Sequence, residues 1–279
     1  MRSLTNNARR LMHPLAVLAR ALGQAALWLA LLLPLLIFPL SALSQRWFYP
    51  QLVPREWTIA PLLDQLGRVD VRDALGATLQ IALWASAIAL LVSYPAARTL
   101  GMYDFRGKRL VLMALFLPTV VPPVAMGMGL NILFLRLGLA GTLVGVILVH
   151  LIPVLPYTVF ALVGVFARYD PNYEYQALVL GASRARIFFS VTLPLVLPGL
   201  LVAGLFAFLI SWSQYLLTFL IGGGQVLTLP LLLFAAVAGG NPTTIAILAL
   251  IFAAPPIVVI AATARYLTSA EGLERPGQY

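Results

Sequence analysis

Long apolar stretches alternate with short polar segments along the chain. Six of them reach the length of about 20 residues that a helix needs to cross the hydrocarbon core of a bilayer. They lie at 22–43, 75–97, 110–134, 141–166, 193–219 and 243–266. Their apolar residues run almost continuously, which is typical of membrane helices, whereas apolar and polar residues alternate in barrel strands. The pattern predicts an all-α membrane protein with six transmembrane helices.

A seventh apolar run, at 226–238, is too short to span a bilayer comfortably. Three glycines precede it at 222–224, and the sequence Gly-Gly-Asn-Pro follows it at 239–242. An interrupted helix at membrane depth is tolerated only where protein or a water-filled cavity covers its backbone. We therefore expect a short helix that dips into the outer side of the bundle without crossing it.

The composition agrees with a membrane location. Of the 279 residues, 61% are hydrophobic and 10% are charged, whereas soluble domains carry about 25% charged residues. The chain has no cysteine, which excludes disulfides, thiol catalysis and cysteine-based metal sites. The sequence therefore favours a multi-pass membrane protein over a soluble enzyme.

Basic residues are unevenly divided between the two sides of the predicted bundle. Thirteen of the 18 Lys and Arg residues fall in one alternating set of tails and loops. A basic excess marks the cytoplasmic side, so both termini are expected there. This placement accounts for the net charge of +9 without a nucleic-acid-binding surface. The expected parts are a cytoplasmic tail at 1–21, a first helix with its outer loop at 22–74, a core at 75–267 and a cytoplasmic tail at 268–279.

A polar segment between the fourth and fifth apolar stretches carries helix boundary signals. Asp170 is a good N-cap, and Pro171 fits the first helical position, where no backbone N–H is needed. Glu174 adds negative charge near the positive end of the helix, and Gly181 supplies the left-handed turn that ends it. The apolar residues that share one face of this helix are Tyr173, Ala177 and Leu180.

Ser183 is placed to cap a second helix that continues into the fifth apolar stretch. The sequence therefore predicts a helix–Gly–helix corner on the cytoplasmic side, with its first helix over 170–182. An apolar face in that position needs a cover. The cover is either the chain's own bundle with the lipid headgroups or a partner protein.

Three short segments resemble the EAA signature of bacterial ABC-importer permeases. They are Glu-Tyr-Gln-Ala at 174–177, Gly-Ala-Ser at 181–183 and Thr-Leu-Pro at 192–194. The acid at 174 stands one position before the usual acid of the signature. Residues 104–109, before the third apolar stretch, are also similar to this family. The resemblance extends over about 75–267 and is nearest to the spermidine/putrescine branch.

The resemblance implies a permease subunit in a bacterial inner membrane, with the type I importer fold. It implies a cytoplasmic ATPase dimer, a second permease subunit that is a paralogue or the same chain, and an extracytoplasmic solute-binding protein as partners. The chain has no phosphate-binding G-x-x-x-x-G-K-[ST] loop. It is therefore expected to bind no cofactor and to have no catalytic or metal site, with ATP and Mg²⁺ held by the ATPase. The residues expected to couple the chain to that ATPase are Asp170, Tyr173, Glu174, Ala177, Leu180 and Gly181.

Polar residues within the predicted spans are candidates for lining a translocation path, because such groups are costly in lipid. They are Asn131, His150, Ser211, Ser213, Gln214 and Tyr215. Each of them has an alternative role in hydrogen bonding between helices, and that alternative is favoured for His150. In the polyamine branch the positions matching Ser213 and Gln214 often carry acids, and both are neutral here. The expected solute is polyamine-like or another small organic molecule.

An ion-coupled secondary transporter is the alternative function. It predicts carboxylates within the membrane, and none of the nine Asp and Glu residues falls inside a predicted span. A membrane enzyme would need a nucleophile–base set, an H-E-x-x-H sequence or paired carboxylates in the spans, and these patterns are absent from the sequence. The importer permease therefore remains the main prediction.

Overall fold

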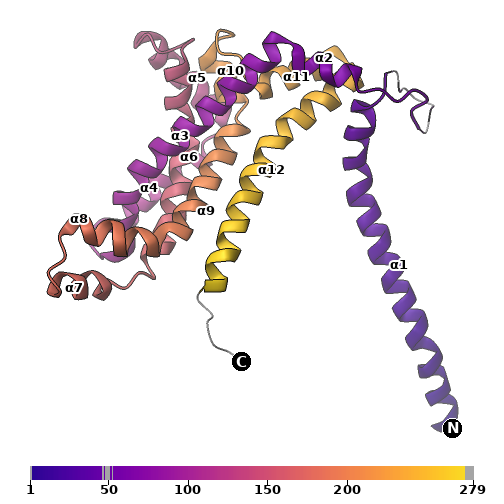
Figure 1. Cartoon of the computed structure of the whole chain (residues 1–279), viewed down its shortest axis with the longest axis horizontal. Helices are drawn as coiled ribbons and strands as arrows, with labels where there is room; N and C mark the ends of the chain where they lie inside the picture. The colour runs from indigo at the N-terminus through magenta and orange to yellow at the C-terminus, as the bar shows by residue number, and fades with distance from the viewer. Residues whose placement is uncertain (1, 46, 48–50, 52, 274–279) are drawn as a thin grey trace. The chain divides into compact units, whose positions relative to one another are not determined.

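The computed structural model describes residues 2–45, 47, 51 and 53–273, and over these ranges the chain forms helices and no β-strand. The all-α prediction is therefore confirmed. The elements, drawn in Figure 1, are α1 (Arg2–Ala42), α2 (Ala60–Gly67), α3 (Val69–Met102), α4 (Lys108–Val120), α5 (Pro123–Arg136), α6 (Leu143–Phe166), α7 (Asn172–Val179), α8 (Arg184–Ile187), the π-helix η1 (Phe188–Thr192), α9 (Leu193–Trp212), α10 (Leu216–Gly222), α11 (Leu229–Gly239) and α12 (Pro242–Leu273).

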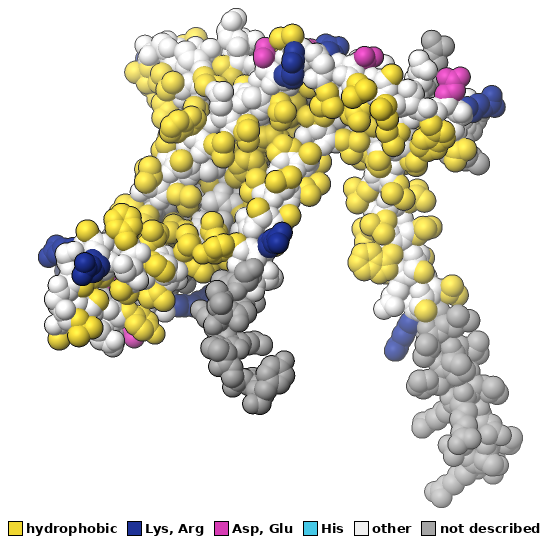
Figure 2. Space-filling model, in the orientation of Figure 1, with side chains coloured by type: hydrophobic (Ala, Val, Ile, Leu, Met, Phe, Trp, Pro, Cys, Tyr) yellow, Lys and Arg dark blue, Asp and Glu magenta, His cyan; other side chains and the backbone are white. Residues whose placement is uncertain are grey.

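The chain folds as two compact units. The first comprises residues 1–66 and 239–250, and the second comprises residues 67–238 and 251–279. The first unit holds α1 and α2, with a β-bridge between Ser44 and Trp57 in the segment that joins them. The second unit holds α3 to α10 and most of α11 and α12. On the face of this second unit drawn in Figure 2, hydrophobic side chains cover the middles of the helices, and charged ones lie toward the ends.

Five helical stretches in the described part of the chain are long and apolar enough to cross a membrane. They are Arg20–Ala42, Val69–Met102, Leu143–Phe166, Arg184–Trp212 and Pro242–Thr268. The bent pair α4–α5 brings the number to six when it is counted as one span. The structure therefore agrees with the predicted set of apolar segments.

The predicted span over 110–134 is present as a bent pair of helices and not as one continuous helix. The helix stops at Val120, and α5 starts at Pro123 with a bend of 99° between the two axes. Pro122 and Pro123 lie at this bend. Proline has no N–H to donate and forces the preceding residue out of the helical conformation. The proline pair therefore breaks an apolar run whose length alone predicted a span.

Helices α3, α6 and α9 pack together as the centre of the second unit. Small residues allow the close approach: Ala85, Ala89 and Ala97 of α3 are fully buried. Gly101 lies against Phe166, and a Cβ at this glycine would be 2.7 Å from the Phe166 Cβ. Close packing at small side chains is the usual basis of helix association in membranes.

The predicted fifth span, 193–219, begins earlier and ends earlier than expected. The helical stretch starts at Arg184 and passes through η1, where the Leu193 N–H donates to the Phe188 carbonyl five residues back. Pro194 follows and has no N–H with which to continue the ordinary ladder. The stretch then ends at Trp212, and α10 starts at Leu216. The following helix α11 is short and apolar, as predicted for 226–238.

Candidate functional site

The predicted corner forms at α7 and α8, and its boundaries follow the local sequence signals. The Asp170 carboxylate accepts a hydrogen bond of 2.9 Å from the backbone N–H of Asn172, where α7 begins. At the other end Gly181 adopts a φ of 82°. The Gly181 N–H donates to the Leu178 carbonyl, and the Ala182 N–H donates to the Ala177 carbonyl. These two bonds form a Schellman motif, which requires the left-handed residue.

α7 and its C-cap Leu180 expose apolar side chains. Val179 and Leu180 are 88% and 86% exposed, and Tyr173 and Tyr175 are about half exposed. Val179 and Leu180, at the C-terminal end of the helix, are called the exposed face of α7 below. The sequence pattern did not indicate Val179, because the predicted face followed a 3–4 spacing alone and the exposure of Val179 depends on how the corner is held. Apolar residues gathered at such a tip indicate an interaction surface.

Glu174 points the other way, into the second unit. Its carboxylate accepts two hydrogen bonds from the Arg98 guanidinium, at 2.7 and 3.0 Å. The hydroxyls of Tyr169 and Thr192 each donate to the same oxygen, Oε1, at 2.9 Å. The Glu174 side chain is 18% exposed and that of Arg98 is 30% exposed. The prediction that Glu174 belongs to a coupling surface is untested, but in this structure its partners come from the chain itself.

These contacts determine the charge state of Glu174. Burial alone would raise the pKa of its carboxyl, but the hydrogen bonds from Arg98, Thr192 and Tyr169 outweigh it and hold the pKa below the ordinary value. Burial raises the pKa of the Tyr169 hydroxyl, which therefore stays a neutral donor. The group works as a carboxylate with three donor residues. The pairing with Arg98 has no local sequence signal, because Arg98 lies 76 residues away.

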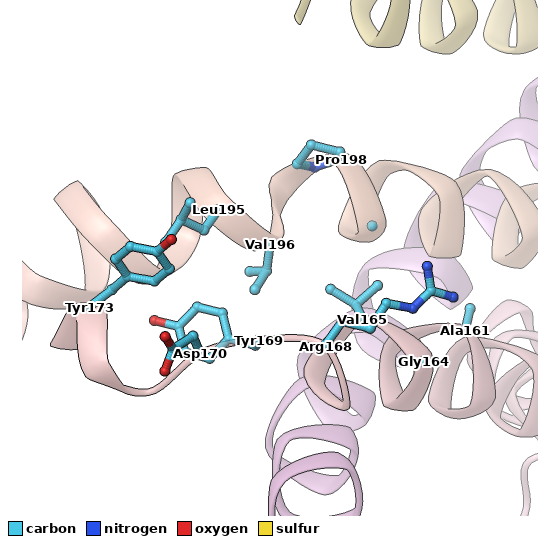
Figure 3. Close-up of a pocket in the computed structure, with 11 residues that line it drawn as sticks. Ala161, Gly164, Val165, Arg168, Tyr169, Asp170, Tyr173, Leu195, Val196 and Pro198 are labelled. Atoms are coloured by element: carbon cyan, nitrogen blue, oxygen red, sulfur yellow. The ribbon is translucent and has the colours of Figure 1, made fainter. Parts of the chain in front are cut away.

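A cavity of about 510 Å³ lies beside the corner, between the end of α6, the start of α7 and α9. In Figure 3 Tyr169, Asp170 and Tyr173 lie at one end of it and Arg168 at the other, with Val196 between. Because of this space, α7 is not closely packed over its whole inner side. No residue of α7 is buried.

The second candidate region is the break between α9 and α10. His150 of α6 lies within hydrogen-bond distance of Ser211 Oγ through Nδ1 and of Thr218 Oγ1 through Nε2, both at 2.8 Å. His150, Ser211 and Thr218 are all buried. The histidine therefore bridges the two helices on either side of the break, which agrees with the favoured interhelical role.

Continuous helical spacing across the predicted fifth span would place Ser211 and Tyr215 on one face, but the helix does not continue through 213–215. The Ser213 hydroxyl donates to the Leu209 carbonyl at 2.9 Å, and such back-bonding competes with the helical ladder. Tyr215 stacks on Phe234 with 4.1 Å between ring centroids. The break therefore has a cause in side-chain contacts that the apolar pattern does not reveal.

The remaining path candidates occupy different surroundings. Gln214 lines one small cavity together with His150, Ser211 and Thr218. Asn131 lies apart on α5, where its side-chain amide donates to the Leu220 carbonyl at 2.6 Å. The structure thus places Ser211, Gln214 and His150 around one cavity, which Asn131 does not line. Within the described residues no cluster of three or more His, Cys, Asp or Glu side chains could hold a metal ion.

Several transport proteins are similar to this chain. PhnV of Salmonella typhimurium, named for a 2-aminoethylphosphonate transport system, is 31% identical over 205 residues, which are 73% of this chain and 76% of PhnV. ModB of Mycobacterium tuberculosis, named as a molybdenum transport system permease, is 30% identical over 214 residues, or 67% and 81% of the two chains. PotC of Haemophilus influenzae, named as a spermidine/putrescine transport system permease, is 31% identical over 157 residues, or 56% and 61%.

A solved structure shares the fold. It is a bacterial ABC transporter involved in the import of the acidic polysaccharide alginate, and one of its chains superposes with a TM-score of 0.67 at 16% identity. The superposition covers 89% of this chain and 95% of that one. Residues 89–270, which include the corner and the broken span, match the family model described as binding-protein-dependent transport system inner membrane component. The chain belongs to this family of multi-pass importer permeases, as its resemblance to the EAA signature predicted.

Proposed function

We propose that this importer permease receives the work of ATP hydrolysis at the corner formed by α7, Gly181 and α8, where a cytoplasmic ATPase subunit docks. The single observation that carries this proposal is the exposed face of α7, with Val179 and Leu180 almost fully exposed at its tip. Fully burying one such side chain contributes about 1.5–3 kcal/mol. A hydrophobic groove on a partner would therefore stabilise the complex substantially at this point.

The distribution of basic residues indicates on which side of the membrane the corner lies. The corner carries Arg168, Arg184 and Arg186, which belong to the set of segments with 13 of the 18 basic residues. The ATPase would accordingly dock in the cytoplasm. Because the chain has no phosphate-binding loop, ATP and Mg²⁺ would bind to the ATPase dimer, and this chain would serve as a non-catalytic subunit.

The family implies further partners. A solute-binding protein would deliver the solute on the outer side, and a second permease subunit, either a copy of this chain or a paralogue, would complete the path. We place this path beside the break between α9 and α10. Non-helical backbone at membrane depth is tolerated where it lines a cavity or is covered by protein.

The solute is inferred from the groups at the break. Ser213 and Gln214 offer neutral hydrogen-bonding groups and no carboxylate, so the region favours a small polar organic solute over a polycation. The relatives are named for 2-aminoethylphosphonate, for spermidine and putrescine, and for molybdenum. A polyamine remains the second candidate because of the sequence resemblance to that branch.

The docking proposal is tested with Leu180→Asp, which places a charge in the contact. The transporter is purified through a tag on this chain, and the ATPase that co-purifies is quantified. We expect loss of the ATPase, because an unpaired buried carboxylate is costly. Leu137→Asp is the matched control, since Leu137 is 60% exposed and lies at the end of α5. Equal recovery of the ATPase with both variants would refute docking at α7.

The path proposal is tested separately by uptake into proteoliposomes that contain the full transporter. Radiolabelled 2-aminoethylphosphonate and spermidine are the two probes, and the parent chain is compared with Gln214→Ala. We expect the variant to assemble normally and to take up the transported probe with lower apparent affinity. Unchanged uptake would place Gln214 outside the path.

A further inference from the structure

The attachment of α7 to the bundle depends on very few contacts. The helix has eight residues, none of them buried, and an isolated helix of this length is not stable in water. On one side it borders the 510 Å³ cavity and not a packed surface. Besides the backbone links at its two ends, α7 therefore passes force to the membrane helices through a small number of side chains.

Glu174 makes the strongest of these contacts. Its carboxylate joins four separate parts of the fold: Arg98 on α3, Tyr169 after α6, Glu174 itself on α7, and Thr192 at the end of η1. Thr192 is buried, and Arg98 lies directly beside the buried Ala97 of the α3–α6–α9 core. Charge-assisted bonds are stronger than neutral ones, and this carboxylate accepts four bonds.

Glu174 lies on the opposite side of α7 from the exposed face. Successive residues of a helix turn by 100°, so Glu174 lies about opposite the midpoint between Val179 and Leu180. The exposed face of α7 thus points away from the bundle while Glu174 holds the same helix to it. Among the side-chain contacts of α7, the four bonds of Glu174 are placed to resist a push on the exposed face.

We propose that Arg98, Tyr169, Glu174 and Thr192 form the joint that transmits movement of the α7 corner to α3 and α9, with Glu174 as a positioning residue and not a docking contact. This inference rests on the proposed docking at α7. Without the joint, only the short backbone segments at its two ends would tie α7 to the membrane helices, and part of its movement would be lost in them. With it, α7, α3 and α9 move as one body.

The experiment uses spin labels, which the absence of native cysteine makes site-specific. Asn172→Cys on α7 and Val92→Cys on α3 are both exposed positions outside the exposed face and the joint. The distance between the two labels is measured in the purified full transporter, without nucleotide and after trapping with MgATP and vanadate. In the parent we expect one narrow distance distribution that nucleotide does not change.

Three variants of the joint are compared with this parent. Glu174→Ala should retain the ATPase but give a broader distribution whose mean shifts on trapping. Glu174→Gln keeps an acceptor for Tyr169 and Thr192, and should broaden the distribution less. The exchanged pair Arg98→Glu with Glu174→Arg should restore the narrow distribution, because both hydroxyls can also accept hydrogen bonds.

The outcomes separate the joint from the docking proposal. Parent-like distances in Glu174→Ala would overturn the proposed joint. If the alanine variant cannot be purified, parent-like distances in Glu174→Gln would do the same. Failure of the exchanged pair to narrow the distribution would also count against an ionic joint. Retention of the ATPase by Leu180→Asp would instead overturn docking, and the distances measured without nucleotide would still test the attachment of α7.

Discussion

Replacing Gly181 with alanine should loosen the corner by an amount that the structure defines. Gly181 has a φ of 82°, and a Cβ built on it would meet no atom within 4 Å. The penalty is therefore backbone strain alone, about 1–2 kcal/mol for a residue with a side chain in the left-handed region. A change of that size alters an equilibrium by a factor of about 5–30.

Hydrogen exchange measures this change directly. The N–H groups of Gly181 and Ala182 are protected by the two bonds of the Schellman motif, and local opening controls their exchange. In Gly181→Ala we expect exchange of these amides to accelerate by the same factor of about 5–30. The measurement follows the peptides covering 170–190 in the purified transporter by mass spectrometry.

Two controls isolate the effect. Gly181→Asn should exchange almost as slowly as the parent, because asparagine tolerates the left-handed conformation. Gly76→Ala adds a methyl group on α3, where no atom lies within 4 Å and φ is not positive, and it should leave 170–190 unchanged. Parent-like exchange of the Gly181 and Ala182 amides in Gly181→Ala would show that left-handed geometry is not what holds the corner.

Three further predictions concern the membrane core and the joint. Gly101→Ala places a Cβ 2.7 Å from the Phe166 Cβ and should lower the thermal unfolding temperature, since overpacking costs about 1–3 kcal/mol; an unchanged temperature would contradict close packing there. His150→Ala should cost about 1–2 kcal/mol in a denaturant titration, because it removes a partner from buried Ser211; His150→Asn should recover part of this. Acidification should release α7, because the folded pKa of Glu174 is depressed. The stabilisation of α7 by Glu174 is complete above the ordinary pKa of 4.5. It is lost as the pH falls through the folded pKa. The Asn172–Val92 label distance measured against pH checks this, and Glu174→Gln should abolish the dependence.

The corner could be predicted from sequence because each of its signals is local. The N-terminal bond joins Asp170 to the N–H two residues on, and the Schellman motif spans 177–182. Ser183 caps α8 by accepting from the Arg186 N–H at 3.4 Å. Each of these contacts lies within a few residues of the chain, so spacing and residue type carry the information.

The joint and the second break depend on residues that are distant in sequence. Arg98 reaches Glu174 across 76 positions, and His150 reaches Ser211 and Thr218 across 61 and 68. No periodic pattern in one segment encodes such pairs. The first break differs, because the proline pair at 122–123 was visible in the sequence. Proline interrupts a helix through its own missing N–H and its restriction of the preceding residue, so this signal is local to the chain.

The hydrogen bonds at the second break narrow the candidates for solute contact. Asn131, Ser211 and His150 each have a protein partner, and the Ser213 hydroxyl bonds to its own helix. Tyr215 is held by its ring, which leaves only its hydroxyl available.

Gln214 is different: among the described residues its side-chain amide has no hydrogen-bond partner, although its backbone carbonyl accepts from Thr218 at 3.0 Å. A polar group at membrane depth that is not bonded within the protein is costly, and it has a use where a solute or water supplies the missing partner. Of the six path candidates from the sequence, we therefore expect Gln214, with the Tyr215 hydroxyl beside it, to make the principal contact with the solute. His150 bonds to Ser211 and Thr218 on the two sides of the break in which Gln214 lies.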